Sequence, residues 1–190
     1  VFGVPVKPKS LRGVVRWLTC FRFALQAVPR YGATRMRITV LRGISGAGKS
    51  TWAARHAHEA LVVSTDAFFL VRGEYRFDPR KLQENHGRCF RAFMEGILRA
   101  KPWIIVDNTN VQAWEYAPYV LAGQAYGYEV ELLTFPCSVE TSLARKQLVP
   151  AEDLRHIHAR FEQETREMPR RFRGIHRLMA DPDAAEQPLS

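Results

Sequence analysis

The stretch Gly43-Ile44-Ser45-Gly46-Ala47-Gly48-Lys49-Ser50 decides the fold expected for this 190-residue chain. It follows a β-branched run at 37–41 and precedes an amphipathic segment that starts near Lys49. Closely spaced glycines let the backbone wrap around phosphate groups, and the N-terminus of the following helix attracts the anion. The pattern and its setting therefore predict a phosphate-binding loop (P-loop) between a strand and a helix, rather than an ordinary glycine-rich turn.

Each part of this loop has an expected task in binding ATP and Mg²⁺. Lys49 would reach the β- and γ-phosphates, and the hydroxyl of Ser50 would ligate Mg²⁺. The residues expected to hold the nucleotide are Gly43, Ser45, Gly46, Ala47, Gly48, Lys49, Ser50 and Thr51.

Short apolar runs alternate with longer amphipathic runs through the rest of the chain. Strands are expected at 37–41, 61–64, 103–106 and 128–134. Helices are expected at 49–59, 79–100, 111–125, 138–147 and 151–166. This order predicts an α/β fold with a parallel sheet covered by helices on both faces. Ligands of such sheets bind at the carboxyl ends of the strands.

An acidic residue follows the second predicted strand, in Ser64-Thr65-Asp66. A carboxylate at this place can accept the proton of an attacking hydroxyl, as a kinase base does. The alternative is that Asp66 only starts a turn. Its position beside a P-loop favours the catalytic interpretation.

A second acidic residue follows the third predicted strand, in Asp107-Asn108-Thr109-Asn110. Asp107 is expected to support Mg²⁺, while Thr109 and Asn110 can hydrogen-bond an acceptor. Turn formation before the next helix is the alternative for all of them. A basic pair, Arg145 and Lys146, can cover the transferring phosphoryl group or simply stabilise a helix C-terminus.

Charge and cysteine content limit the other possibilities. The net charge is +9, but residues 1–35 hold seven basic and no acidic residues, so the remainder carries only +2. We expect 1–35 to be a basic leader, either an over-extended start or a targeting segment, and 181–190 to be a disordered tail. Three scattered cysteines form no metal or disulfide pattern. A cytoplasmic protein is expected, with an organelle possible if the leader is real, and no membrane association.

Residues 37 to about 166 resemble the P-loop polynucleotide kinase-like group, which includes the 5′-kinase half of phage polynucleotide kinase. The resemblance rests on four stretches, 41–52, 64–69, 106–110 and 143–147. It implies a P-loop NTPase three-layer αβα sandwich over 36–180, with a four- or five-stranded parallel sheet of the adenylate-kinase type. It also implies transfer of the γ-phosphate of ATP to the 5′-hydroxyl of RNA or DNA.

Carried over by position, Lys49 matches the phosphate-binding lysine, Asp66 the general base and Lys146 a lid cation. An arginine that the phage enzyme has three residues past its base is Phe69 here, which leaves the acceptor open. Phe69 and Arg72 are nevertheless candidates for lining the acceptor site. A small-molecule kinase for a sugar, nucleoside or antibiotic is the first alternative, and a non-catalytic ATP-binding module is the second.

Overall fold

Five parallel strands form the central sheet of the computed structural model, which describes residues 35–145 and 149–179. In spatial order they are β2 (Leu61–Val63), β5 (Trp103–Asp107), β1 (Arg37–Arg42), β6 (Glu129–Thr134) and β7 (His176–Leu178). The sheet confirms the predicted α/β fold. The four predicted strands correspond to β1, β2, β5 and β6. The fifth, β7, is three residues long and was not predicted individually.

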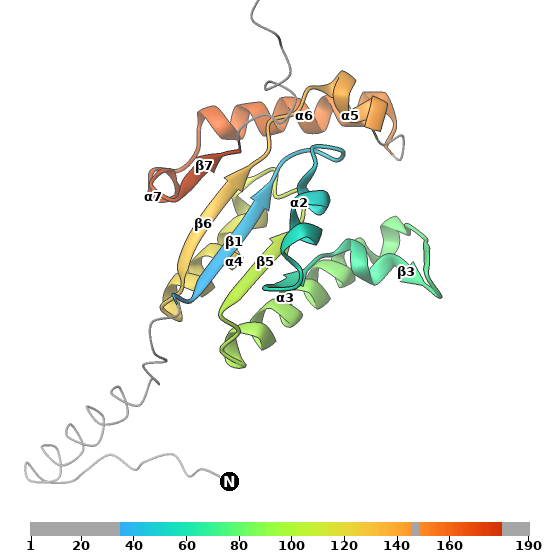
Figure 1. Cartoon of the computed structure of the whole chain (residues 1–190). Helices are drawn as coiled ribbons and strands as arrows, with labels where there is room; N and C mark the ends of the chain where they lie inside the picture. Colours follow the sequence, from blue (N-terminus) through green and yellow to red (C-terminus); the bar gives the residue numbers. More distant parts are fainter. Residues whose placement is uncertain (1–34, 146–148, 180–190) are drawn as a thin grey trace, which may run out of the picture. The chain divides into compact units, whose positions relative to one another are not determined.

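Helices cover both faces of the sheet, as Figure 1 shows with α2 in front and α4 behind. One face carries α2 (Lys49–His56) and α6 (Ala151–Arg166), and the other carries α3 (Leu82–Leu98) and α4 (Ala113–Ala125). This arrangement confirms the three-layer sandwich.

The buried strands explain why both faces need helices. In β1, Ile38 and Val40 pack against α3 and α4, whereas Leu41 packs against α2 and α6. Successive side chains of a strand point to opposite faces, so an almost continuous apolar run requires cover on both sides. The sheet is therefore the common core of the two helical layers.

Several short elements complete the described part of the chain. They are the 3₁₀ turns η1 (Asp66–Phe69) and η2 (Pro79–Lys81), the antiparallel hairpin β3 (Leu70–Val71) with β4 (Glu74–Tyr75), and the helices α5 (Val139–Arg145) and α7 (Arg170–Arg173). Figure 1 shows the hairpin standing away from the sheet. The segment 66–78, between the strand expected at 61–64 and the helix expected at 79–100, thus contains a hairpin.

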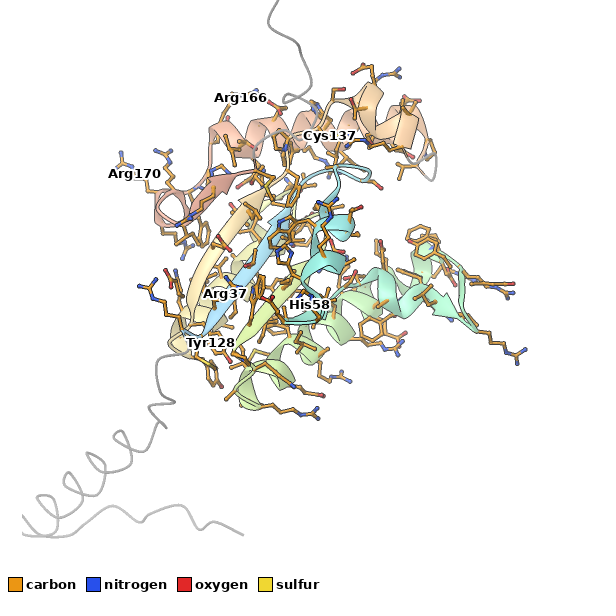
Figure 2. The ribbon with its side chains drawn as sticks, in the orientation of Figure 1. Arg37, His58, Tyr128, Cys137, Arg166 and Arg170 are labelled. Atoms are coloured by element: carbon orange, nitrogen blue, oxygen red, sulfur yellow. The ribbon has the colours of Figure 1, made fainter. Side chains whose placement is uncertain are left out.

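The two ends of the sheet are easily distinguished. Arg37 starts β1, its guanidinium lies 3.4 Å from the ring centroid of Trp103, and Tyr128 directly precedes β6. Figure 2 shows Arg37 and Tyr128 toward one end and Cys137, which follows β6, toward the other. The P-loop follows β1 and therefore belongs to the end marked by Cys137.

Some predictions concern residues outside this description. The leader up to residue 34, the proposed lid cation Lys146 and the tail at 181–190 all lie outside the described residues. Within 35–145 and 149–179, no helix is both long and apolar enough to cross a membrane.

Candidate active site

The P-loop connects the end of β1 to the start of α2 and depends on three glycines with positive φ. Gly43, Gly46 and Gly48 have φ angles of 151°, 79° and 91°. Side chains with a Cβ rarely adopt these angles. A Cβ at Gly48 would meet none of the described atoms within 4 Å, so the loop leaves room at this position for a phosphate to approach.

Gly43 is additionally required by close packing against the neighbouring strand. A Cβ at this position would lie 2.7 Å from the backbone oxygen of Phe135. The Gly43 amide also donates a hydrogen bond of 2.9 Å to the carbonyl oxygen of Thr109. The first residue of the loop is thus fixed between the segments that follow β5 and β6.

Replacing Gly43 by alanine is expected to weaken ATP binding by at least about tenfold, because the loop must shift to relieve both the clash and the backbone strain. Gly127→Ala is the matched control, since Gly127 has a φ of 78° and open space around it, and precedes β6 at the other end of the sheet. Equal ATP affinity of the two variants, measured by equilibrium dialysis, would contradict the prediction.

Lys49 is held inside the loop that it is expected to serve. Its side chain is only 7% exposed, and Nζ donates hydrogen bonds of 2.8 Å to the carbonyl oxygens of Gly43 and Ile44. Ser50 and Thr51, at the start of α2, have exposed side chains. The Lys49 amine therefore lies at the phosphate-binding loop, where two backbone carbonyl oxygens already accept hydrogen bonds from it.

The end of β5 lies beside the base of the P-loop. Asp107 pairs in register with Leu41 of β1, and its side chain is mostly buried. Because parallel strands end at the same edge of the sheet, this register brings the Asp107 carboxylate to the edge where the loop begins. The predicted magnesium-supporting position is therefore compatible with the fold.

Asn108 connects the segment after β5, which contains Asp107, to the segment after β2, which contains Asp66. The sequence analysis did not predict a separate role for it. Its Oδ1 accepts a hydrogen bond of 2.9 Å from the backbone amide of Thr65, next to Asp66. Its Nδ2 lies 3.4 Å from the hydroxyl of Tyr119 and 3.6 Å from Sγ of Cys89. The buried amide group thus fixes the turn that carries Asp66 to the end of β5.

Asp66 begins η1 and is exposed to solvent. Its backbone amide donates to Oγ of Ser64, and its carboxylate accepts a hydrogen bond of 3.2 Å from the hydroxyl of Tyr75. Asp66 therefore begins a turn, and its carboxylate is also exposed, so the structure is compatible with both interpretations of this residue. An accessible carboxylate at this end of the sheet can serve as a proton acceptor.

Two of the predicted acceptor contacts need correction. Phe69 is only 2% exposed, and its ring packs against Tyr75 and Phe77, with centroids 6.1 Å and 5.1 Å away. Asn110 is also 2% exposed, has a φ of 49° and uses Nδ2 to donate a 2.7 Å hydrogen bond to the carbonyl oxygen of Leu41. Both side chains therefore support the site from inside instead of facing an acceptor.

The other two predicted acceptor residues are accessible. The side chain of Thr109 is exposed, although its backbone carbonyl is occupied by Gly43. Arg72 is exposed at the tip of the β3–β4 hairpin, where its φ is 53°. The structure therefore leaves both side chains available to a substrate.

Helix α5 contacts the P-loop directly and carries Arg145 at its exposed C-terminal end. The hydroxyl of Ser142, which is buried on α5, donates to the carbonyl oxygen of Ser45 in the loop. A Cβ on Gly46 would lie 3.0 Å from the Ser142 carbonyl oxygen. This tight contact places the basic end of α5 on the same part of the molecule as the P-loop, although it leaves the role of Arg145 a prediction.

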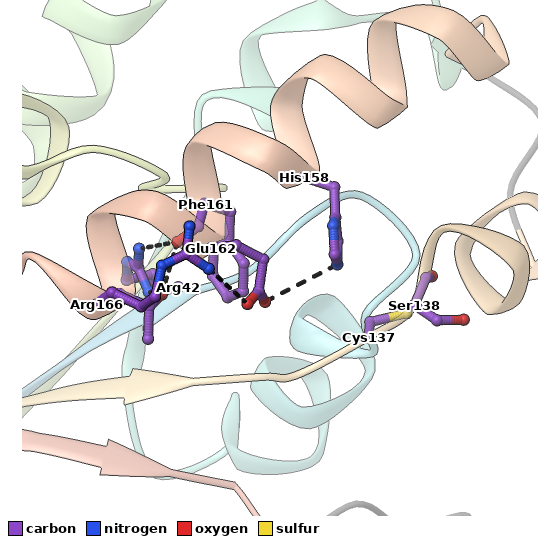
Figure 3. A network of polar contacts seen from close by, with 8 residues as sticks. Arg42, Cys137, Ser138, His158, Phe161, Glu162 and Arg166 are labelled. Carbon is purple, nitrogen blue, oxygen red and sulfur yellow. Dashed lines mark hydrogen bonds and ion pairs between the residues drawn. The ribbon is translucent and has the colours of Figure 1, made fainter.

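Arg42, the last residue of β1, is fully buried although no motif singles it out. Nη1 donates to Oγ1 of Thr165 over 2.7 Å, and Nη2 donates to the carbonyl oxygens of Val111 and Phe161 over 2.9 and 3.1 Å. Figure 3 shows this guanidinium beneath α6, next to the contacts of Glu162 with its helix neighbours. Burial lowers the pKa of Arg42, but three acceptors compensate for the desolvation of its charge. The residue before the P-loop is thereby tied to α6.

The predicted Mg²⁺ site at this loop would use few protein side chains. Ser50 and Asp107 are the side chains that would support the metal. Among the described residues, no group of three or more His, Cys, Asp or Glu side chains could hold a metal ion. Few protein ligands are expected for Mg²⁺ that arrives with nucleotide phosphates, because these phosphates supply part of its coordination.

Comparison with known families agrees with this geometry. The profile of the AAA domain family matches residues 38–168, which include the P-loop and the ends of β2 and β5. The chain belongs to this family. NEDD4-binding protein 2 from Homo sapiens is 39% identical to this chain over an alignment of 97 positions, and the match covers 49% of this chain and 5% of that protein. The chain therefore spans only a small part of this relative.

A solved structure shows the same fold at low sequence identity. A chain of the Pnkp1/Rnl/Hen1 RNA repair complex matches this AAA domain with a TM-score of 0.59 and 18% identity. The match covers 75% of this chain and 49% of the other. A gluconokinase from Sinorhizobium meliloti 1021 matches with a TM-score of 0.49 and 16% identity, over 81% of this chain and 86% of the other. The family match confirms the P-loop family predicted from the motifs, and the chain of the RNA repair complex shows the same α/β fold.

Proposed function

We propose that this chain is an ATP- and Mg²⁺-dependent kinase that transfers the γ-phosphate to a hydroxyl, and that its acceptor is the 5′-hydroxyl of RNA or DNA. One observation carries the proposal. Asn108 Oδ1 accepts a hydrogen bond from the backbone amide of Thr65, so the next residue, Asp66, lies at the same sheet edge as Asp107 and the P-loop. A phosphate-binding loop and an accessible proton acceptor on one edge are the parts that phosphoryl transfer to an alcohol requires.

The proposed chemistry assigns one task to each group. Lys49 offsets negative charge on the β- and γ-phosphates. Ser50 and Asp107 would hold Mg²⁺, which would supply further charge neutralisation. The oxygen of the acceptor hydroxyl forms a bond to the γ-phosphorus, and the bond from that phosphorus to the β–γ bridging oxygen breaks. Asp66 accepts the proton that the hydroxyl loses. ADP and a phosphate ester are the products.

The surroundings of Asp66 support a nucleic-acid acceptor. The neighbouring hairpin exposes Leu70 and Val71 on β3 and Tyr75 on β4, and Phe77 follows it with an exposed ring. Arg72 adds a cation at the tip of the hairpin. Aromatic rings can stack on bases while cations approach the backbone, which is the usual basis of single-strand binding.

A small-molecule acceptor is the second candidate, and the charges of the same region favour it. Arg76 lies 2.6 Å from a carboxylate oxygen of Glu74, and Arg80 lies 3.0 Å from one of Asp78. These pairs leave little excess positive charge beside Asp66 for a polyanion, in line with the net charge of +2 outside residues 1–35.

The decisive experiment measures transfer of label from γ-labelled ATP in the presence of Mg²⁺. The acceptors are an RNA and a DNA oligonucleotide of matching sequence with a free 5′-hydroxyl. The same oligonucleotides with a 5′-phosphate serve as controls, because they offer no 5′-hydroxyl. We expect labelling of the hydroxyl forms alone, and labelling that falls steeply as salt increases.

The other outcomes separate the alternatives. Labelling of a sugar or nucleoside but of neither oligonucleotide, with little dependence on salt, would replace the nucleic-acid acceptor by a small molecule. Tight ATP binding without a phosphorylated product from any acceptor would contradict the kinase proposal and favour a non-catalytic ATP-binding module.

A further inference from the structure

The carboxylate of Asp66 contacts Tyr75, a residue that has no task in the proposed reaction. The hydroxyl of Tyr75 donates a hydrogen bond of 3.2 Å to Oδ1 of Asp66. Within the described residues, Tyr75 is the one side chain that hydrogen-bonds this carboxylate. The orientation of an otherwise exposed Asp66 side chain therefore depends on Tyr75.

The β3–β4 hairpin is built so that Tyr75 reaches Asp66. Its two-residue turn consists of Arg72 and Gly73, with φ angles of 53° and 85°. Two successive positive φ values characterise the tight turns that match the twist of paired strands. The turn sets Leu70 opposite Tyr75, which folds residue 75 back beside the turn that begins at Asp66.

A backbone hydrogen bond and a ring contact keep the hairpin in this register. The backbone amide of Arg76 donates a 2.9 Å hydrogen bond to the carbonyl oxygen of Phe69, at the base of the hairpin. The buried ring of Phe69 packs edge-on against the ring of Tyr75. Phe69 therefore acts as the internal support for Tyr75, which gives a physical role to a residue that the sequence had assigned to acceptor binding.

We propose that Tyr75 is a positioning residue that orients the Asp66 carboxylate toward the acceptor hydroxyl. This inference rests on the proposed kinase function. The phenol binds Oδ1 and leaves Oδ2 to meet the acceptor, and the transferred proton goes to Oδ2 while Tyr75 keeps its own. Partial desolvation, together with the nearby Asp66 charge, raises the pKa of Tyr75 to about 12, and the hydroxyl is a protonated donor at neutral pH.

Tyr75→Phe tests the inference because it removes the hydroxyl and keeps the ring that packs against Phe69. We expect kcat for transfer to fall roughly tenfold, the size of effect expected for one hydrogen bond to a charged group. The KM values for ATP and acceptor, the ATP affinity and the melting temperature should stay close to those of the wild type. Tyr126→Phe is the matched control, since Tyr126 is exposed at the C-terminal end of α4.

A second measurement tests the contact itself, independently of activity. In urea unfolding, Tyr75→Phe and Asp66→Ala remove the same hydrogen bond. The double variant should therefore lower the unfolding midpoint less than the two single changes combined. Strictly additive changes would show that the two side chains do not interact in solution and would overturn the inference.

The kinetic outcomes distinguish this inference from the proposed function. Absence of transfer by the folded wild-type protein would contradict the kinase function. Transfer by the wild type together with an unchanged kcat in Tyr75→Phe would contradict only the role of Tyr75. A fall in melting temperature and ATP affinity along with kcat would assign Tyr75 to structural support of the hairpin.

Discussion

Asp66→Asn is expected to lower phosphoryl transfer by about 10²- to 10⁴-fold, the range attributed to a general base. Asparagine has nearly the same shape, and its Oδ1 can still accept the hydrogen bond from Tyr75. It cannot accept the proton of the acceptor hydroxyl at neutral pH. The loss should appear in kcat, measured with labelled ATP at saturating acceptor, while the dissociation constant for ATP stays unchanged.

Asp153→Asn provides the control for this change, because Asp153 is an exposed aspartate in the first turn of α6. Transfer by Asp66→Asn at the rate of this control would mean that another group accepts the proton. Loss of ATP binding in Asp66→Asn would instead indicate that the turn after β2 supports the nucleotide site.

Lys49→Met is expected to lower transfer by on the order of 10²- to 10³-fold, the cost of removing one group that stabilises charge in the transition state. Unlike the change at Asp66, it should also weaken ATP binding. Methionine cannot donate hydrogen bonds to the carbonyl oxygens of Gly43 and Ile44. The loop therefore loses the two bonds from Lys49 that stabilise its conformation. Isothermal titration with ATP and the labelling assay would measure the two effects separately.

Lys101→Met is the matched control, because Lys101 is exposed and lies just before β5, at the other end of the sheet from the P-loop. Both variants remove one positive charge, so they share any effect of net charge on binding. Equal ATP affinities for Lys49→Met and Lys101→Met would contradict a role for Lys49 in holding phosphates.

The sequence was most informative where local pattern and chemistry coincide. The glycine spacing of the P-loop, the apolar run of β1 and the acidic residue ending β5 could be predicted because each signal is contained in a few adjacent residues. The parallel arrangement then followed from the alternation of strands and helices. These signals were enough to predict the edge of the sheet where the candidate site lies.

The orientation of individual side chains could not be predicted in the same way. Asn110 is polar in a turn-like sequence, yet its amide group points inward to the Leu41 carbonyl. Phe69 follows the proposed base closely but packs inside the hairpin, and Tyr75 reaches that base only because a two-residue turn reverses the chain. Such contacts depend on tertiary packing, which overrides local preference.

The central position of β1 also constrains how the domain can form. Arg37 pairs with Trp103 of β5 and with Glu129 of β6, so the strand that leads into the P-loop obtains both neighbours only from later parts of the chain. During synthesis the phosphate-binding segment emerges before β5 and β6, and it lacks these supporting strands until residues near 134 are available. Non-local pairing of this kind slows folding, because chain entropy is lost before the contacts reward it. Nucleotide can therefore stabilise the product of folding but gives no support to its first steps.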